Sequence, residues 1–113
     1  MEQKLRGLNR EDIALSSITM AELHYGAAHS KNRESNIKKV RIFCSSLTLC
    51  PFEEHAAEIF GEIKEILASE RKMIGVMDLL IASIALAKKA TLVTHNTREF
   101  SRIPTLKIED WFE

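Results

Sequence analysis

Three acidic side chains and one amide in this sequence have the chemistry to share a divalent cation. Glu22 follows an apolar run of strand length, Asp78 opens an almost wholly apolar helix, and Asn96 and Glu99 follow a β-branched run. In α/β sheets, functional groups gather beyond the carboxyl ends of the strands. Oxygen ligands without a His or Cys cluster favour Mg²⁺ or Mn²⁺. With a phosphodiester substrate, such an ion activates water and neutralises the leaving oxygen.

Each of these acids also has an ordinary structural explanation. Asp78 lies in the first turn of its expected helix, where the helix dipole stabilises a carboxylate by roughly 0.3–1 kcal/mol, and it can act as a capping acid. Glu22 comes three residues after Thr19, which is the spacing of a capping box. Convergence of the acids on one place would distinguish a metal site from two separate helix caps.

The segments that must position these side chains alternate strands with helices. The pattern predicts strands at residues 13–17, 47–52, 91–94 and 106–108, and helices at 18–29, 36–46, 53–69 and 77–88. A short helix or turn is expected at 97–103, and residues 1–9 read as the end of a helix. This alternation predicts an α/β domain with a largely parallel sheet.

Helical spacing also predicts which side chains face the core. For the helix at 36–46, the predicted inward residues are Ile37, Val40, Ile42 or Phe43, and Leu47. For the helix at 53–69, they are Ala56, Ile59, Phe60, Ile63, Ile66 and Leu67. The acids of the second helix are interleaved with Lys64 and are expected to form a solvated face. Trp111 and Phe112 are expected to pin the C-terminus to the core.

Composition narrows the class of protein. A chain of 113 residues is expected to form one domain, residues 1–113, and its formal net charge of +0 gives no global basic field. Cys44 and Cys50 lack metal-site spacing, so reduced thiols in a cytoplasmic protein are expected. No apolar run reaches the ~18 residues of a membrane span, and the first ten residues are too polar for a signal peptide.

Three segments resemble the signature blocks of PIN-domain ribonucleases, and in particular the VapC toxins of bacterial toxin–antitoxin pairs. The segments are residues 17–26 (SITMAELHYG), 74–82 (IGVMDLLIA) and 92–100 (LVTHNTREF). The closing LKIEDW at 106–111 is also typical of the family. The similarity runs in the right order from about residue 10 to the end of the chain.

The resemblance implies a PIN-like three-layer α/β fold with a mainly parallel sheet. It also implies a Mg²⁺-dependent endoribonuclease (Mn²⁺ as the alternative ion) that acts on tRNA or mRNA, forms a homodimer and is inhibited by a cognate VapB-like antitoxin. Glu22 matches the acid of the second family block, and Asp78 matches the metal-binding acid of the third. Asn96 and Glu99 match the last block, where many members carry Asp. The implied metal ligands are Asp78, Glu22 and Glu99, with Asn96 as a weak ligand or a group that orients water.

One feature of the family has no match here. The family opens with an apolar strand ending in Asp-Thr-Asn, whose Asp is a principal metal ligand, whereas residues 1–9 resemble the end of the helix that follows it. We therefore expect an N-terminally truncated domain that lacks the first central strand, with the strands at 13–17 and 91–94 flanking a gap or closed together. A late start site, gene decay, or a strand supplied by another chain would each explain this.

The sequence favours two functions over a third, a non-nucleolytic phosphohydrolase that would use the same acids but has no sequence feature of its own. The first is RNA cleavage of the VapC type, with basic side chains guiding the phosphates (Lys31, Arg33, Arg71, Lys72 and Arg98). The second is a catalytically dead PIN-like module that only binds an antitoxin or partner chain, because the first metal-binding Asp of the family is absent from this sequence.

Overall fold

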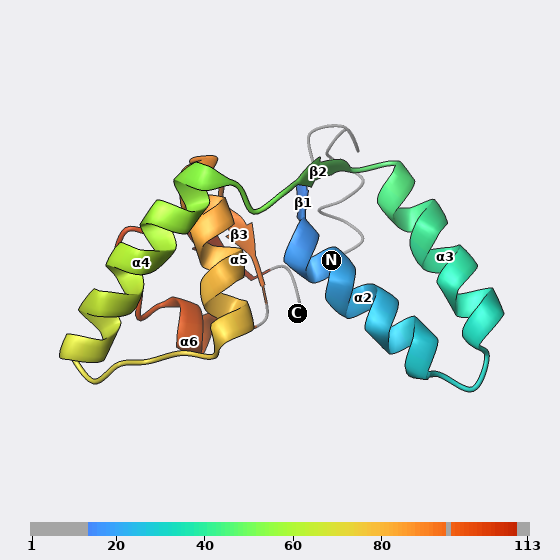
Figure 1. The fold of residues 1–113 in the computed structure, drawn as a ribbon, viewed down its shortest axis with the longest axis horizontal. Helices are drawn as coiled ribbons and strands as arrows, with labels where there is room; N and C mark the ends of the chain where they lie inside the picture. The colour runs from blue at the N-terminus through green and yellow to red at the C-terminus, as the bar shows by residue number, and fades with distance from the viewer. Residues whose placement is uncertain (1–13, 95, 111–113) are drawn as a thin grey trace. The chain divides into compact units, whose positions relative to one another are not determined.

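The computed structural model describes residues 14–94 and 96–110 (Figure 1). These residues fall into two compact units, which are described separately: an N-terminal unit that ends at Pro51 and a C-terminal unit that begins at Phe52. The predicted ends of the chain, at residues 1–9, Trp111 and Phe112, lie outside the described residues.

The N-terminal unit is a helical hairpin joined to a pair of short strands. Its elements are β1 (Ala14–Ser16), α2 (Ser17–His29), α3 (Arg33–Ser45) and β2 (Thr48–Cys50). β1 and β2 run parallel, with Ala14 opposite Thr48 and Ser16 opposite Cys50. Helix α2 begins directly after β1 because the Ser16 hydroxyl caps it, accepting a hydrogen bond from the Thr19 backbone N–H at 2.9 Å.

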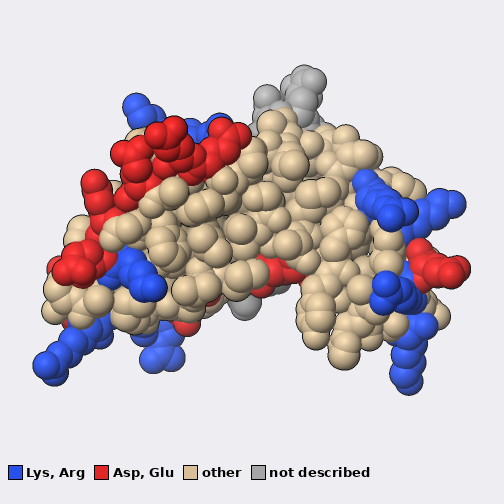
Figure 2. Space-filling view, in the orientation of Figure 1, with Lys and Arg blue, Asp and Glu red and all other residues tan. Residues whose placement is uncertain are grey.

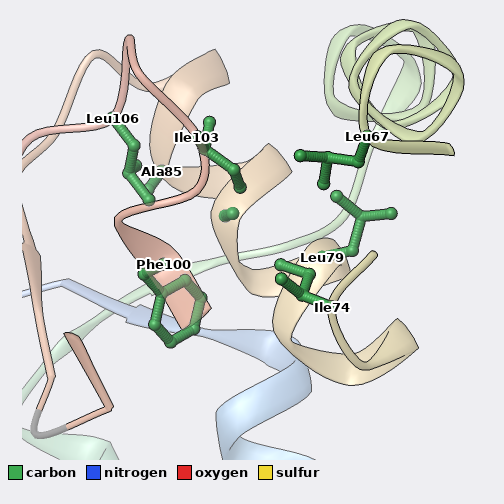
Figure 3. Packing of buried hydrophobic residues seen from close by; sticks show 8 residues of the cluster. Leu67, Ile74, Leu79, Ala85, Phe100, Ile103 and Leu106 are labelled. Atoms are coloured by element: carbon green, nitrogen blue, oxygen red, sulfur yellow. The ribbon is translucent and has the colours of Figure 1, made fainter. Parts of the chain in front are cut away.

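The C-terminal unit packs two long helices against a second pair of strands. Its elements are α4 (Glu54–Ser69), α5 (Val76–Ala87), β3 (Leu92–Val93), α6 (Thr97–Phe100) and β4 (Ile108–Glu109). β3 and β4 run parallel. The side chains of its core come from α4, α5, α6 and the connections between them (Figure 3): Leu67, Ile74, Leu79, Ala82, Ala85, Phe100, Ile103 and Leu106.

Both long helices of this unit end in the same way. Arg71 after α4 and Lys89 after α5 adopt the left-handed conformation, with φ of 57° and 54°. The next backbone N–H then reaches back into the helix, from Lys72 to the Leu67 carbonyl at 2.8 Å and from Ala90 to the Ala85 carbonyl at 2.9 Å. This is the Schellman arrangement, which turns the chain sharply at the helix end. After α4, it directs the connection at residues 70–75 back towards the start of α5.

The structure confirms the predicted α/β class with parallel strands. The described strands form two separate two-stranded sheets, one in each unit. The expectation that strands 13–17 and 91–94 flank a gap depends on how the two units are placed, so it stays a prediction, as does the single domain over 1–113. Cys44 and Cys50 are both free, and no helix among the described residues is long and apolar enough to span a membrane.

Several predicted details are wrong. Helix α3 begins at Arg33 rather than at 36, and its buried side chain is Cys44, whereas Ile42 and Phe43 are exposed. Ile66 of α4 is also exposed, because the face that packs against the core is centred on Ala56 and Leu67. Spacing alone cannot choose between neighbours that differ by one 100° step around a helix.

Charged side chains are distributed unevenly over the surface (Figure 2). The acids of α4 are exposed as predicted, and acidic side chains gather over this helix in the figure. Lys38, Lys39 and Arg41 are exposed on α3 of the N-terminal unit. The α4 acids therefore form a solvated face.

The first prediction concerns the α5 residue next to Asp78. Leu79 is 0% exposed in the core cluster, so Leu79→Ala should lower the free energy of unfolding by about 2–5 kcal/mol through lost burial and a residual cavity. Val76 on the same helix is 53% exposed, and Val76→Ala should change it by no more than about 0.5 kcal/mol. Urea unfolding followed by circular dichroism measures both, and equal losses would contradict the described core.

Candidate functional site

Asp78, Asn96 and Glu99 meet in the C-terminal unit. The Asn96 side-chain amide donates from Nδ2 to Asp78 Oδ2 at 3.1 Å and to Glu99 Oε2 at 3.4 Å. Asp78 lies in the first turn of α5, Asn96 immediately precedes α6, and Glu99 lies within α6. The structure therefore brings together three of the four predicted site residues, from segments 18 residues apart in the sequence.

The hydrophobic core fixes the two carboxylates. Asp78 is followed by Leu79, which is fully buried, and Glu99 is followed by Phe100, which is 3% exposed. Asn96 enters the site from the end of β3, where its backbone N–H donates to Thr94 Oγ1 at 3.0 Å. Both acids are partly exposed, so solvent and ligands can reach them. The backbone of each acid is therefore held by a buried neighbour, whereas its carboxyl group remains accessible.

The charges in the site interact strongly. The pKa of Glu99 is lowered from its ordinary value, chiefly by a hydrogen bond with the Asp78 carboxyl group, while partial burial opposes this shift. The Asn96 amide, the Gly75 backbone N–H and the positive charge of Arg102 lower it further. Two carboxylates that accept from the same amide repel each other, and a divalent cation would compensate this repulsion.

The structure decides the capping explanation for only one of the two acids. Gly75 occupies the N-cap position of α5 and Asp78 lies in the first turn, so stabilisation of Asp78 by the helix dipole stays a second explanation for this acid. Helix α2 is capped by Ser16, which places Thr19 at the third helical position instead of at the cap. The predicted Thr19–Glu22 capping box is therefore wrong, and Glu22 is an exposed acid without that role.

The described groups suit a hard cation. Two carboxylates and the carbonyl oxygen of an amide are the kind of ligands that Mg²⁺ and Mn²⁺ accept, with waters completing the coordination. No group of three or more His, Cys, Asp or Glu side chains with metal-binding geometry occurs among residues 14–94 and 96–110. Glu22 belongs to the N-terminal unit, so its contribution to this site stays a prediction.

Two groups of the site were not predicted as site residues. The Gly75 backbone N–H and the positive charge of Arg102 each contribute to the lowered pKa of Glu99. Arg102 Nη1 also donates to the Met73 backbone carbonyl at 2.6 Å. The sequence offers one weak signal for each: Gly75 lies at the mouth of the apolar helix, and Arg102 follows Glu99 by three residues, which is one helical turn.

Comparison with known proteins gives the site a context. The PIN domain family model matches residues 2–106. Ribonuclease VapC2 of Rickettsia felis is 48% identical over 99 residues, which cover 88% of this chain and 74% of that protein. The tRNA(fMet)-specific endonuclease VapC of Salmonella typhimurium is 40% identical over 104 residues, covering 92% and 79% of the two chains.

Solved structures agree with these matches. The chain is similar to one in the DNA-bound VapBC structure from Salmonella typhimurium, with a TM-score of 0.92 and 38% identity over 98% of this chain and 84% of that one. It is also similar to a chain in Rickettsia felis VapBC2 bound to a promoter DNA fragment, with a TM-score of 0.88 and 44% identity over 98% and 83%.

The site geometry yields a prediction for Asn96. Asn96→Asp replaces the amide donor with a third carboxylate, so repulsion should lower the melting temperature of the metal-free protein by about 2–5 °C. The same change adds a ligand, so Mn²⁺ should raise the melting temperature of the variant more than that of the parent chain.

Differential scanning fluorimetry with EDTA and with MnCl₂ tests this expectation. Asn32→Asp is the matched control because Asn32 is an exposed residue before α3 without a side-chain capping bond. It should show neither effect. An Asn96→Asp variant that is as stable as the parent in EDTA would contradict the role of the amide between the two acids.

Proposed function

The chain belongs to the PIN domain family and, within it, to the VapC ribonuclease toxins of VapBC toxin–antitoxin pairs, and from this premise we propose that it is a Mg²⁺-dependent endoribonuclease. The observation that supports this activity is the Asn96 amide, which donates to both Asp78 Oδ2 and Glu99 Oε2. Two carboxyl groups held together by one amide form a favourable site for a divalent cation.

We propose a division of roles among these residues. Asp78 and Glu99 would hold the ion, which would supply an activated water and neutralise charge on the leaving oxygen. Asn96 keeps the two carboxylates together and orients the attacking water through its amide. Glu22 is proposed as a further carboxylate ligand, consistent with its position after β1 and with the absence of a capping role. Mn²⁺ is the alternative ion.

The comparisons support the proposed partners. A relative is named for its action on tRNA(fMet), and we propose tRNA as the substrate class, with mRNA as the alternative. Similar solved structures are VapBC complexes, which supports a VapB-like antitoxin as the partner that inhibits this chain. We further propose a homodimer in the cytoplasm. The exposed basic side chains predicted to guide RNA phosphates are Lys31, Arg33, Arg71, Lys72 and Arg98.

A catalytically dead binding module is the second candidate. It is favoured by the small number of acids in the described site, where the C-terminal unit joins two carboxylates and an amide. Each anionic ligand contributes strongly to the affinity for Mg²⁺, so a site with few acids can lose the ion and keep the surface that binds an antitoxin.

The activity assay separates the two candidates. Asp78→Asn removes the charge of a proposed ligand with little change in shape, and should reduce Mg²⁺-dependent tRNA cleavage by at least about 100-fold. Glu62→Gln, which removes one exposed acid from the solvated face of α4, should leave cleavage unchanged. Products are resolved on denaturing gels with MgCl₂ or EDTA. Cleavage that persists in EDTA would refute metal dependence, and antitoxin binding without cleavage by the parent chain would support the binding module.

The role of Glu22 is tested separately. Glu22→Gln should reduce cleavage and weaken Mn²⁺ binding by at least about 10-fold, because one anionic ligand is lost. Glu34→Gln is the control, since Glu34 is an exposed acid on α3 of the same unit. Mn²⁺ affinity can be measured by electron paramagnetic resonance of the free ion. Equal behaviour of the two variants would remove Glu22 from the site.

A further inference from the structure

We propose that the exposed face of α2 around Tyr25 and His29 binds an unstacked base of single-stranded RNA, while Arg33 binds the adjacent phosphate. The inference rests on the proposed function, because it names the part of an RNA substrate that this chain contacts. It starts from the two rings, which lie one helical turn apart and stack with their centroids 5.6 Å apart and their planes 15° from parallel.

The aromatic pair is open to a further stacking partner. Tyr25 is 69% exposed, the largest exposed fraction among the large hydrophobic side chains of residues 14–94 and 96–110, and His29 is exposed as well. The stack with His29 holds the tyrosine ring in one orientation, so less side-chain freedom is lost when a base binds. Every nucleobase has a π-face and can stack on such a ring.

Gly26 gives a second reason to place a ligand on this face. At about 100° per residue, the exposed residues Glu22, Tyr25, Gly26 and His29 fall within one arc of roughly 100° around α2. Glycine within a helix is less stable than alanine, yet a Cβ at Gly26 would meet no described atom within 4 Å. Packing therefore does not require this glycine, whereas a ligand that approaches the helix backbone closely would.

Charge favours RNA over a protein segment as the occupant. Residues 14–51 contain five Lys and Arg side chains and two Glu side chains, and all seven are exposed. Several of the cations lie on α3, over which Lys and Arg side chains gather in Figure 2. An RNA strand supplies both a base for the rings and phosphates for these cations.

The turn between α2 and α3 holds Arg33 beside the rings. Arg33 Nη1 donates to the Ala28 carbonyl at 3.2 Å, which places the guanidinium at the last turn of α2, next to His29. The turn is fixed by two further bonds, from Ser30 Oγ to the Ala27 carbonyl at 2.7 Å and from Asn36 Nδ2 to Ser30 Oγ at 2.9 Å. The positions for a base and a phosphate are therefore formed before RNA binds.

The first experiment measures the affinity for fluorescein-labelled hexariboadenylate by anisotropy in EDTA, so that binding is observed without metal-dependent cleavage. Tyr25→Leu keeps an apolar side chain but removes the ring, and should weaken binding by at least about 5-fold. Tyr25→Phe keeps the ring and should bind like the parent chain. Phe43→Leu is the control, because Phe43 is a 45% exposed aromatic residue on α3. Unchanged affinity in Tyr25→Leu would overturn the proposal and leave this face as a protein-binding surface, and equal losses in both Tyr25 variants would overturn stacking.

A second variant separates RNA binding from folding. Gly26→Gln should raise the melting temperature, because glutamine forms helices better than glycine and a Cβ meets no described atom there, but it should weaken RNA binding by about 5-fold or more. Gly61→Gln on α4 is the matched control, since Gly61 is also exposed within a helix and has the same open space. It should raise the melting temperature and leave RNA binding unchanged. Identical RNA affinities of the two variants would exclude close approach at Gly26.

The phosphate contact is tested by salt dependence. Arg33→Gln should reduce the slope of log affinity against log salt concentration by about 0.7, the value for one phosphate contact with a single strand. Lys107→Gln removes an exposed cation of the C-terminal unit and should leave the slope as it is in the parent chain. A slope unaffected by Arg33→Gln would remove Arg33 from the proposed site.

The third experiment observes the tyrosine ring directly. The chain contains one tyrosine, so tyrosine-selective ¹³C labelling gives one set of ring signals, which a stacked adenine should move upfield. Ring signals that do not move at saturating hexariboadenylate would overturn the proposal, and Mg²⁺-dependent cleavage by the same protein would then leave the nuclease function intact. If the signals move as expected but the parent chain cleaves no RNA in MgCl₂, the nuclease function fails and the base-binding face stands.

Discussion

The convergence of two acidic side chains, Asp78 and Glu99, on the amide of Asn96 is the constraint on which the candidate site depends. Carboxylates this close repel each other unless a proton, a cation or hydrogen-bond donors compensate. The amide of Asn96 donates to both acids. The Gly75 backbone N–H and the positive charge of Arg102 also lower the pKa of Glu99. The pKa of Glu99 is lowered as a result of these interactions. Packing of the core alone would not hold two acids together, so these polar interactions are needed to offset their repulsion.

The hydrophobic core provides the rigidity that the site needs. Apart from Asn96, each polar group of the site lies next in sequence to a side chain of the buried cluster: Gly75 beside Ile74, Asp78 beside Leu79, Glu99 beside Phe100, and Arg102 beside Ile103. These four buried residues come from three different parts of the chain, and Figure 3 shows them in one packed cluster. The site therefore forms only when the core does. Any ligand that binds the assembled site adds its binding free energy to the folding of this unit.

Much of this organisation could be predicted from the sequence. The order of strands and helices follows from apolar periodicity, and the parallel pairing follows from their alternation. Polar groups at strand ends and at the mouth of an apolar helix converge in α/β folds, which predicts that Asp78, Asn96 and Glu99 meet, as their hydrogen bonds show. The role of Glu22 could not be decided in the same way. Ser16, Ser17 and Thr19 can all cap a helix, and only the observed bond to Ser16 excludes the capping box.

The unpredicted part of the site consists of interactions with the backbone. An N–H donor such as that of Gly75 is present at every non-proline residue, so its use leaves no mark in the sequence. Every residue also has a carbonyl acceptor, so the sequence does not reveal that the Met73 carbonyl accepts a bond from Arg102. Without that bond, Arg102 resembles any other basic residue. The buried face of α3 was also assigned wrongly, because Ile42, Phe43 and Cys44 are all apolar and only packing against the neighbouring helix decides which of them is buried. Side-chain chemistry identifies the charged groups of a site, whereas the groups that orient them emerge only from the path of the folded chain.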